Sequence, residues 1–352
     1  MVFTPNKQLV FLKSLPTGYP VAGEHLAVQS SSTIDLDAPL QEGQVLLKVH
    51  LLAMDPFMRG PMRLSEPGDY FPSYTVGQPI YGITTSTVLK STNPRFKKDD
   101  LVVGMTTFEE YTIVSSGPFS EWLAVCNEAK TSGLPLSYYV GILGMPGHTA
   151  YAGLLEVGKP KKGETLFVSG ASGTVGQLVG QMGKLLGLHV VGSAGSDEKC
   201  AFLKEAGFDG VVNYKTDNMR EKLAELCPNG VDVYFDNVGG ETLEAAIERA
   251  NRLARFVCCG MASTYNAEKE VGIRNLFKII PKHITLEGFA VTDYSHLEGQ
   301  FKKEVTQWLL DEKIKYRETI TDGFDEAAQA FVDVMHGRNF GKQVVFVSKP
   351  SF

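Results

Sequence analysis

The hydrophobic positions of this 352-residue chain follow two different patterns. From about residue 160 onward, short apolar runs alternate with stretches whose apolar residues recur three and four positions apart. The runs predict buried parallel strands, and the stretches predict the helices that cover them. The predicted strands are Leu166–Val168, Leu188–Gly192, Val211–Tyr214, Val231–Phe235, Arg255–Cys259 and Ile284–Phe289. This half is therefore expected to be α/β, with a doubly wound parallel sheet.

Helix ends are marked along the same half. The predicted helices Asp197–Ala206 and Met219–Leu226 are followed by Gly207 and Pro228, residues that end helices. A third predicted helix, Leu243–Asn251, precedes the predicted strand Arg255–Cys259.

The first 130 or so residues have a β-like pattern that Gly and Pro interrupt. Its runs are Val45–Leu51, Ile80–Val88, Asp100–Met105 and Glu110–Val114, which together predict an irregular β-barrel. The tail carries a helix (Leu297–Leu310), a β-like stretch (Lys315–Ile320), a helix (Glu326–Met335) and a strand (Gly341–Val347). We expect two domains, residues 136–315 and residues 1–135 with 316–352, the tail returning to the first domain.

A glycine-rich turn follows the strand Leu166–Val168. Gly170, Gly173 and Gly176 are spaced three apart, and a helical pattern starts after them. Strand, glycine turn and helix start in this order form the pyrophosphate cradle of a Rossmann dinucleotide-binding domain. Glycines let the backbone approach the phosphates, and the helix start supplies N–H groups.

The next strand indicates which dinucleotide is bound. NAD-binding domains usually place an acid about 20 residues after the glycines, to bind the ribose 2′-hydroxyl. That position is Ser193, its neighbours are small, and Lys199 follows. This pattern favours a 2′-phosphate and thus NADP(H), although Lys199 equally fits a solvated helix charge.

Three polar segments at predicted strand ends should line the site, because ligands bind at the carboxyl ends of such strands. They are Asn213–Tyr214, Asp236–Val238 and Gly260–Tyr265, and each is also typical of an ordinary turn.

Composition narrows the class of protein. Lys and Arg total 34 against 40 Asp and Glu, a net charge of −6, which argues against a nucleic-acid partner. The five cysteines are scattered and fit a reducing compartment. Neither a signal-peptide pattern nor a long apolar run is present in the sequence, so we expect a cytoplasmic protein without a membrane partner.

Seven motifs together resemble one family along the full chain. They are Met54-Asp-Pro-Phe-Met-Arg-Gly60, Gly144–Tyr151, Ser169–Gly176, Gly195–Lys199, Asn213–Lys215, Phe235–Gly240 and Ser263–Tyr265. The sequence resembles the zinc-independent medium-chain dehydrogenase/reductases, and within them the prostaglandin reductase and NADP-dependent alkenal double-bond reductase branch. The resemblance implies a GroES-like barrel beside the Rossmann domain, NADP(H) as cofactor and a homodimer. It also implies reduction of the C=C bond of α,β-unsaturated aldehydes and ketones, with hydride added to the β-carbon and a proton to the α-carbon.

The resemblance also assigns roles by matching position. Tyr265 is expected to be catalytic and to assist the reduction by donating a hydrogen bond; the alternatives are that the nicotinamide ribose hydroxyl is the donor or that Tyr265 only packs the cofactor loop. Phe57 and Tyr81 are expected to line the substrate pocket. The expected cofactor-binding residues are Gly170, Gly173, Thr174, Val175, Gly176, Gln177, Lys199, Tyr214, Asn237, Gly260, Ser263, Tyr265, Phe289, Val291 and Asn339. Phe57 replaces a tyrosine that is common in this branch, which removes a hydroxyl from the substrate wall.

Zinc chemistry is not expected. Zinc-dependent relatives carry a catalytic Cys/His set and four closely spaced cysteines in the first domain, where this chain has Cys126 alone. His25, His50 and His148 have no cysteine close by in the sequence and are expected to be structural or on the surface.

Two other functions fit the same cofactor. One is an NADPH quinone reductase of the same superfamily, which the Met54–Gly60 and Ser263–Tyr265 motifs disfavour. The other is a non-enzymatic NADPH-binding protein, because a fold does not fix a function.

Overall fold

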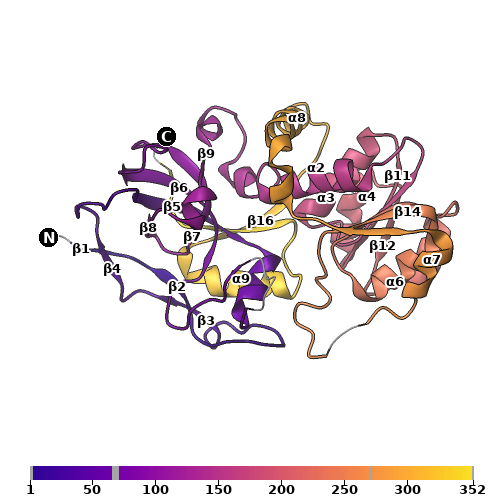
Figure 1. Ribbon diagram of the computed structural model, residues 1–352, viewed down its shortest axis with the longest axis horizontal. Coiled ribbons are helices and arrows are strands. Elements are labelled where there is room, and N and C mark those ends of the chain that lie inside the picture. The colour runs from indigo at the N-terminus through magenta and orange to yellow at the C-terminus, as the bar shows by residue number, and fades with distance from the viewer. Residues whose placement is uncertain (1–2, 66–70, 270–271, 351–352) are drawn as a thin grey trace. The chain divides into compact units, whose positions relative to one another are not determined.

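The computed structural model describes residues 3–65, 71–269 and 272–350. The chain forms two compact units, one comprising Met1–Val140 with Glu318–Phe352 and the other Gly141–Arg317. Figure 1 shows both units.

The second unit is built on a six-stranded sheet in which all neighbouring strands are parallel. Its strands are β10 (Thr165–Val168), β11 (His189–Ala194), β12 (Gly210–Asn213), β13 (Val231–Asp236), β14 (Ala250–Cys258) and β15 (Thr285–Gly288). The order across the sheet is β12-β11-β10-β13-β14-β15. Counted from β10, this is the order 3-2-1-4-5-6 of a Rossmann domain, which confirms the expected fold class for this half.

Helices cover both faces of this sheet, with α3 and α4 on one face and α6 and α7 on the other (Figure 1). The helical segments of this unit are α2 (Met145–Ala152), η4 (Gly153–Gly158), α3 (Thr174–Leu185), α4 (Asp197–Glu205), α5 (Met219–Leu226), α6 (Gly240–Arg249), η5 (Leu276–Lys278), α7 (Ile279–Lys282), η6 (Val291–Leu297) and α8 (Glu298–Leu310). Helix α5 begins where predicted because the Asn218 side chain accepts hydrogen bonds from the N–H groups of Arg220 and Glu221. Ser196 caps α4 in the same way by accepting from Lys199 N–H.

The centre of the sheet is fully buried. Phe167, Val191, Tyr234 and Phe256 are each at most 1% exposed. The rings of Phe167 and Tyr234 are stacked with centroids 5.0 Å apart on adjacent strands β10 and β13. Burying such side chains provides most of the driving force that holds the parallel strands together.

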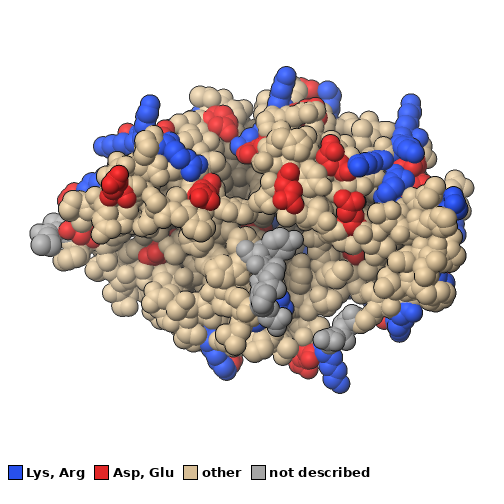
Figure 2. Space-filling view, in the orientation of Figure 1, with Lys and Arg blue, Asp and Glu red and all other residues tan. Residues whose placement is uncertain are grey.

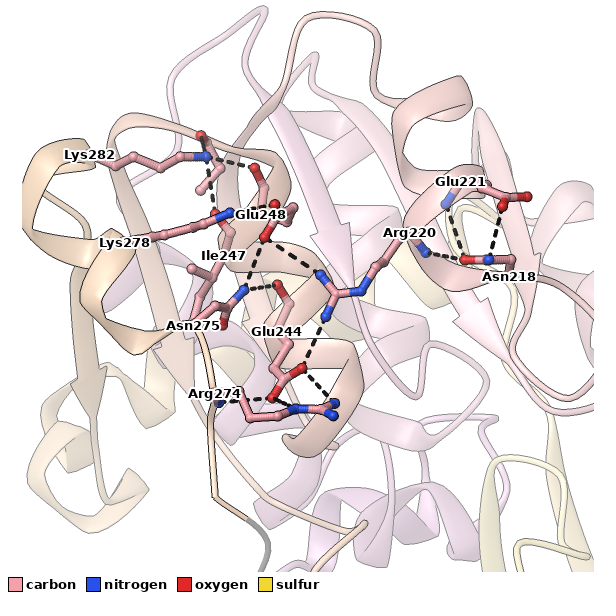
Figure 3. Close-up of polar contacts among 11 residues, drawn as sticks. Asn218, Arg220, Glu221, Glu244, Ile247, Glu248, Arg274, Asn275, Lys278 and Lys282 are labelled. Carbon is pink, nitrogen blue, oxygen red and sulfur yellow. Dashed lines mark hydrogen bonds and ion pairs between the residues drawn. The ribbon is translucent and has the colours of Figure 1, made fainter.

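An ion-pair cluster ties α6 to its neighbours (Figure 3). The Glu244 carboxylate on α6 accepts from Arg220 Nη2 at 3.0 Å and from Arg274 Nε and Nη2 at 2.9 Å each. One helical turn later, Glu248 accepts from Lys278. The Glu244 side chain is only 3% exposed, and the hydrogen bonds from Arg274 lower its pKa to about 2. The cluster therefore holds α5, α6 and η5 together around a buried carboxylate.

The first unit contains a mixed seven-stranded sheet with the order β16-β17-β5-β6-β7-β9, and β8 pairs with β5. Its strands are β5 (Val45–Met54), β6 (Tyr81–Ser91), β7 (Leu101–Thr107), β8 (Tyr111–Val114), β9 (Ala124–Val125), β16 (Glu318–Asp322) and β17 (Lys342–Phe346). Two small sheets pair β1 (Phe3–Pro5) with β4 (Thr33–Asp35), and β2 (Gln8–Phe11) with β3 (Leu26–Gln29). The helical segments are η1 (Pro56–Met62), α1 (Pro118–Glu121), η2 (Asn127–Lys130), η3 (Leu136–Val140), η7 (Phe324–Glu326) and α9 (Ala327–Met335).

The tail is part of this first unit, because β17 pairs with β5. Its pairing with β5 is antiparallel, whereas its pairing with β16 is parallel. Residues of β5, η1 and α9, among them Met54, Met58 and Phe331, share one buried core. The arrangement confirms the expected irregular β-domain.

Some element bounds differ from the predictions. Strand β14 starts at Ala250, whereas the pattern predicted helix up to Asn251, because α6 ends at Arg249 and the backbone of Ala250 is extended. Strand β16 starts at Glu318, later than the predicted Lys315. The backbone N–H groups of Lys315 and Arg317 donate to side-chain amides of α3 instead of to a strand.

Charged side chains of both signs are interspersed over the visible face of each unit (Figure 2). Within residues 3–65, 71–269 and 272–350, no helix combines the length and the apolar character needed to cross a membrane.

Candidate active site

The sheet order reverses between β10 and β13, and the loops that follow these two strands are bonded to each other. Ser169 N–H donates to Phe235 O at 3.1 Å, and Asn237 N–H donates to Ser169 Oγ at 2.9 Å. The Asn237 Nδ2 group donates to Ser169 O at 2.8 Å. A doubly wound sheet opens its ligand crevice at this reversal, on the carboxyl side of the strands. The expected cofactor residue Asn237 therefore lies at the switch point of the sheet.

The side chain of Asp236 holds the loop after β13 in place. Its Oδ1 atom accepts from Tyr234 Oη at 2.7 Å, from Ser169 Oγ at 3.1 Å, and from the N–H groups of Val238 and Gly239 at 2.9 and 2.8 Å. The side chain is fully buried, and burial raises the pKa of its carboxyl group. One carboxylate oxygen therefore fixes both the β10 and the β13 loop.

The glycine turn is shaped for a ligand that approaches the backbone closely. Gly170 has φ +58°, a conformation that favours glycine. A Cβ atom on Gly176 would lie 2.5 Å from Ala171 Cα, so the turn requires glycine there as well. Gly173 caps α3, and the N–H groups of Thr174, Val175 and Gly176 belong to its first turn, where a helix offers them no internal partner. These groups fit a pyrophosphate.

The side chain of Gln177 has another role. It is fully buried, its Nε2 donates to Ser172 O and Arg317 O at 2.8 and 3.0 Å, and its Oε1 accepts from Arg317 N–H at 3.0 Å. Gln181, one helical turn later, pairs with Lys315 in the same manner. The Gln177 amide thus fastens residues 315–317 to α3, and its expected contact with the cofactor stays a prediction.

The loops after β11 and β12 form the side expected to bind the 2′-phosphate. Ser193 lies inside β11 and is 1% exposed, so the loop begins two residues later than the predicted strand end. A Cβ atom on Gly195 would lie 2.5 Å from Tyr214 Oη, which places the tyrosine hydroxyl directly over this loop. Lys199 follows in the first turn of α4.

Charges on this side favour an anion. Burial lowers the pKa of Lys199, and the positive charge of Lys215 lowers it further. The negative charge of Glu198 opposes this shift, and Asp197 accepts from Asn213 Nδ2 at 2.8 Å through its Oδ1. Lys215 was not among the residues expected to bind the cofactor, although its position directly after Tyr214 was a usable signal. Two lysine charges close together fit a group that carries two negative charges.

The loop after β14 contains the expected nicotinamide-side residues. Met261 N–H donates to Tyr265 Oη at 3.3 Å, and a Cβ atom on Gly260 would lie 3.1 Å from the same oxygen. Ser263 Oγ donates to Val238 O at 2.6 Å, which joins this loop to the one after β13. A hydroxyl that accepts a hydrogen bond is polarised toward donating its own proton. Tyr265 is therefore suited to act as a donor.

The remaining predicted residue pair of this unit lies after β15. Phe289 lies edge-on to Tyr294 with ring centroids 6.0 Å apart, and a Cβ atom on Gly153 would meet the Phe289 ring at 2.6 Å. Val291 is the first residue of η6. Hydrogen bonds hold the loops after β10, β13 and β14 together. Contact of Phe289 and Val291 with a cofactor stays a prediction.

Three predicted residues belong to the first unit. The Phe57 ring lies 5.1 Å from that of Phe71, and Tyr81 Oη donates to Pro72 O. Burial raises the pKa of Tyr81. Asn339 Nδ2 donates to Gly341 O at 2.7 Å. Their places in the substrate wall and beside the cofactor stay predictions.

The histidines have structural partners. His25 Nδ1 accepts from Val21 N–H at 3.1 Å, His50 contacts Thr87 and Ser348 at 2.7 to 3.2 Å, and His148 Nε2 lies 3.1 Å from Tyr294 O. In the described residues, no three His, Cys, Asp or Glu side chains gather closely enough to hold a metal ion.

Comparisons with known proteins agree with this geometry. The family described as "Zinc-binding dehydrogenase" matches residues 174–311, and "N-terminal domain of oxidoreductase" matches residues 8–121. The chain is 46% identical to a 2-alkenal reductase (NADP(+)-dependent) of Nicotiana tabacum over 98% of both chains. It is 36% identical to prostaglandin reductase 1 of Bos taurus, over 95% of this chain and 97% of the relative.

A solved structure has the same fold. The crystal structure of CurA in complex with NADPH from Vibrio vulnificus superposes with a TM-score of 0.86, at 38% identity and with coverage of 98% of this chain and 100% of that one. One family assignment follows from the parallel sheet with its glycine turn, the mixed-sheet unit and the relatives that match along the full chain. The chain belongs to the medium-chain dehydrogenase/reductase family, in the branch of the prostaglandin and NADP-dependent alkenal reductases.

Proposed function

We propose that the protein reduces the C=C bond of α,β-unsaturated aldehydes and ketones with NADPH. The observation that carries the proposal is the joined set of loops at the switch point, where Ser169, Asp236 and Asn237 hold the glycine turn beside the Tyr265 loop. The names of relatives support the reaction, because the tobacco relative is a 2-alkenal reductase and another, 43% identical, is a (+)-pulegone reductase of Mentha piperita.

The residues present fit NADPH. The first-turn N–H groups of Thr174–Gly176 would hold the pyrophosphate, because the helix itself offers them no hydrogen-bond partner. Lys199, Lys215 and Tyr214 would hold the 2′-phosphate. When bound, NADPH supplies a hydride. Asn237, Ser263, Phe289, Val291 and Asn339 are proposed to complete its binding site.

Tyr265 is proposed as the catalytic residue. Reduction at the β-carbon leaves negative charge on the substrate's carbonyl oxygen, and a positioned donor stabilises that charge in the transition state. The Tyr265 hydroxyl, polarised by the bond from Met261 N–H, would donate to this oxygen. The α-carbon then takes up a proton, which the same hydroxyl can supply. Phe57 and Tyr81 are proposed to contribute the aromatic wall of the substrate pocket.

We further propose a cytoplasmic homodimer. All five cysteines carry free thiols, as expected in a reducing compartment. Strand β15 is the edge of the parallel sheet, and Thr285, Glu287 and Gly288 on it are exposed. Beside it in sequence, Phe277 and Ile280 are 67% and 74% exposed. An open edge next to exposed apolar side chains favours pairing with a second copy. Light scattering should give twice the chain mass, and Ile280→Asp should shift it toward the monomer.

The activity is tested by NADPH oxidation with enals, enones and quinones, followed by product analysis. We expect the saturated aldehyde or ketone to form from enals and enones at higher kcat/KM than quinol forms from quinones. Faster quinone turnover would favour a quinone reductase. Tight NADPH binding without turnover of any acceptor would favour a non-enzymatic binding protein.

A further inference from the structure

Residues 315–317 are the last three of the second unit, and paired hydrogen bonds hold their backbone against α3. The side-chain amide of Gln181 donates to Lys315 O at 2.8 Å and accepts from Lys315 N–H at 2.7 Å. The amide of Gln177 makes the same pair of bonds with the backbone of Arg317, each at 3.0 Å. Both glutamines are buried. The backbone is therefore fixed on either side of the residue between Lys315 and Arg317.

That residue is Tyr316, and its side chain reaches the start of the same helix. Tyr316 is half-buried, and its Oη atom lies 3.5 Å from Oγ1 of Thr174. Thr174 is the first residue of α3, so its N–H belongs to the groups that a helix leaves without an internal partner. The tyrosine hydroxyl thus lies beside the N–H groups that fit a pyrophosphate.

The contact between the two hydroxyls is long. At 3.5 Å it exceeds the roughly 2.8 Å that is typical of O–H···O hydrogen bonds. A phosphate oxygen is negatively charged and accepts a shorter and stronger hydrogen bond than a neutral hydroxyl does. Beyond its chain neighbours, a Cβ atom on Gly173 would meet only Gly170 O within 4 Å among the described residues, so there is room beside the helix start. An anion bound there would compete well for the tyrosine proton.

The next residue of the segment reaches the side expected to bind the 2′-phosphate. Arg317 Nη2 donates to Glu198 Oε1 at 2.9 Å, and Glu198 directly precedes Lys199 in the first turn of α4. Helices α3 and α4 lie on the same face of the sheet (Figure 1). The side chain of Arg317 therefore reaches α4, whereas the hydroxyl of Tyr316 lies at α3, on the pyrophosphate side.

We propose that Tyr316 is a further cofactor-binding residue, whose hydroxyl donates a hydrogen bond to the pyrophosphate at the start of α3. This inference rests on the proposed function only in taking NADPH as the ligand of the glycine turn. The pyrophosphate is common to NADPH and NADH. Tyr316 therefore adds affinity for both cofactors, whereas Lys199 adds affinity for NADPH alone.

Two truncated ligands separate these roles without turnover. ADP-ribose has the pyrophosphate and lacks the 2′-phosphate, and adenosine 2′-phosphate has the reverse. Tyr316→Phe should raise the Kd of ADP-ribose roughly tenfold, because a hydrogen bond to a charged group at a half-buried site falls in the lower part of its usual range. It should leave the Kd of adenosine 2′-phosphate unchanged, and Lys199→Ala should do the opposite. An unchanged Kd of ADP-ribose in Tyr316→Phe overturns the proposal, and so does equal weakening of both ligands, which is the result of a structural role.

Tyr151→Phe is the matched control. Tyr151 Oη donates to Glu304 Oε2 at 2.9 Å, so this variant also removes a tyrosine hydroxyl that forms a hydrogen bond within the second unit. That bond joins α2 to α8, and neither residue has been assigned to the cofactor site. Both truncated ligands should bind Tyr151→Phe as they bind the unaltered protein. A loss of ADP-ribose affinity equal to that of Tyr316→Phe would overturn the proposal.

The intact cofactors give a second readout. Isothermal titration calorimetry should show that Tyr316→Phe raises the Kd of NADPH and of NADH by the same factor, so that their ratio is preserved. A rise for NADPH alone overturns the assignment of Tyr316 to the pyrophosphate. No acceptor is present in these titrations. If no enal or enone is reduced while the contrast between the truncated ligands persists, the proposed function is overturned and the role of Tyr316 is supported.

Discussion

Replacing Lys199 tests how the protein selects its cofactor. Lys199 lies in the first turn of α4, opposite the Gly195 loop that Tyr214 covers, and Lys215 adds a second positive charge. If these groups bind the 2′-phosphate, Lys199→Ala removes one charge-assisted hydrogen bond from NADPH and nothing from NADH, which has no phosphate at this position.

The loss of NADPH affinity in Lys199→Ala depends on the interactions with the 2′-phosphate that the variant keeps. A hydrogen bond to a charged group contributes about 1.5–3 kcal/mol. Because Lys215 and the start of α4 continue to attract the phosphate in the variant, the lower part of this range applies, about 1.5–2 kcal/mol. We therefore expect the KM for NADPH to rise roughly 10- to 30-fold, since each 1.4 kcal/mol is a factor of ten.

The assay compares cofactors and variants. The KM for NADPH and for NADH is measured at saturating enal, and the inhibition constants of 2′,5′-ADP and 5′-AMP are measured in parallel. Lys199→Ala should weaken 2′,5′-ADP but not 5′-AMP. Lys204→Ala, at the exposed end of the same helix, is the control and should change neither. Equal losses with NADPH and NADH in Lys199→Ala would refute the 2′-phosphate role.

Four further outcomes are expected. Tyr265→Phe should lower kcat roughly ten- to a hundredfold with little change in the Kd for NADPH, and unchanged kcat would leave Tyr265 a packing residue. Glu244→Gln should lower the free energy of unfolding in urea at pH 7 by about 1–2 kcal/mol, less than for a wholly buried pair because its arginine partners are partly exposed. That loss should shrink as the pH falls from about 4.5 toward 2, where native Glu244 becomes protonated; Glu241→Gln, 89% exposed on the same helix, is the control. Burial lowers the pKa of His50 to about 4, below its ordinary 6.5, so between these pH values the unfolded chain binds the proton and the native chain does not. The free energy of unfolding should therefore fall as the pH drops from 6.5 toward 4, and it should fall less steeply in His50→Gln. Chelators should leave turnover intact, and one reproducible zinc per chain would contradict this expectation.

Most helices and strands could be predicted because the residues that define them lie close together in the sequence. The strand β10, its glycine turn and α3 follow one another directly, so the Rossmann unit was readable from spacing alone. Helix α5 occupies the predicted residues 219–226 because local residues, the Asn218 cap and Pro228, set both of its ends. Where a bound depends on a distant partner, as with Lys315 and the amide of Gln181, the apolar pattern predicted a strand that the structure does not form there.

The sequence predicted which loops form the candidate site, but it did not predict the hydrogen bonds that join them. Sequence spacing placed Asp236 at a strand end, yet its role as the shared acceptor of two loops depends on Ser169, 67 positions away. In the same way, Gln177 lies beside the expected cradle by spacing, while its amide bonds to Arg317, 140 positions away. A side chain's partner across such distances is fixed by the sheet order, which no local pattern records.

The replacement of tyrosine by Phe57 acquires a physical meaning in this context. From sequence alone it only removed a hydroxyl from the substrate wall. In the structure the Phe57 ring joins Phe71 and, through it, Trp122, while the hydroxyl of Tyr81 is bonded to Pro72 O. Phenylalanine at this partly buried position extends the cluster of rings without adding a hydroxyl that needs a hydrogen-bond partner, so the departure from the family pattern makes this wall more apolar.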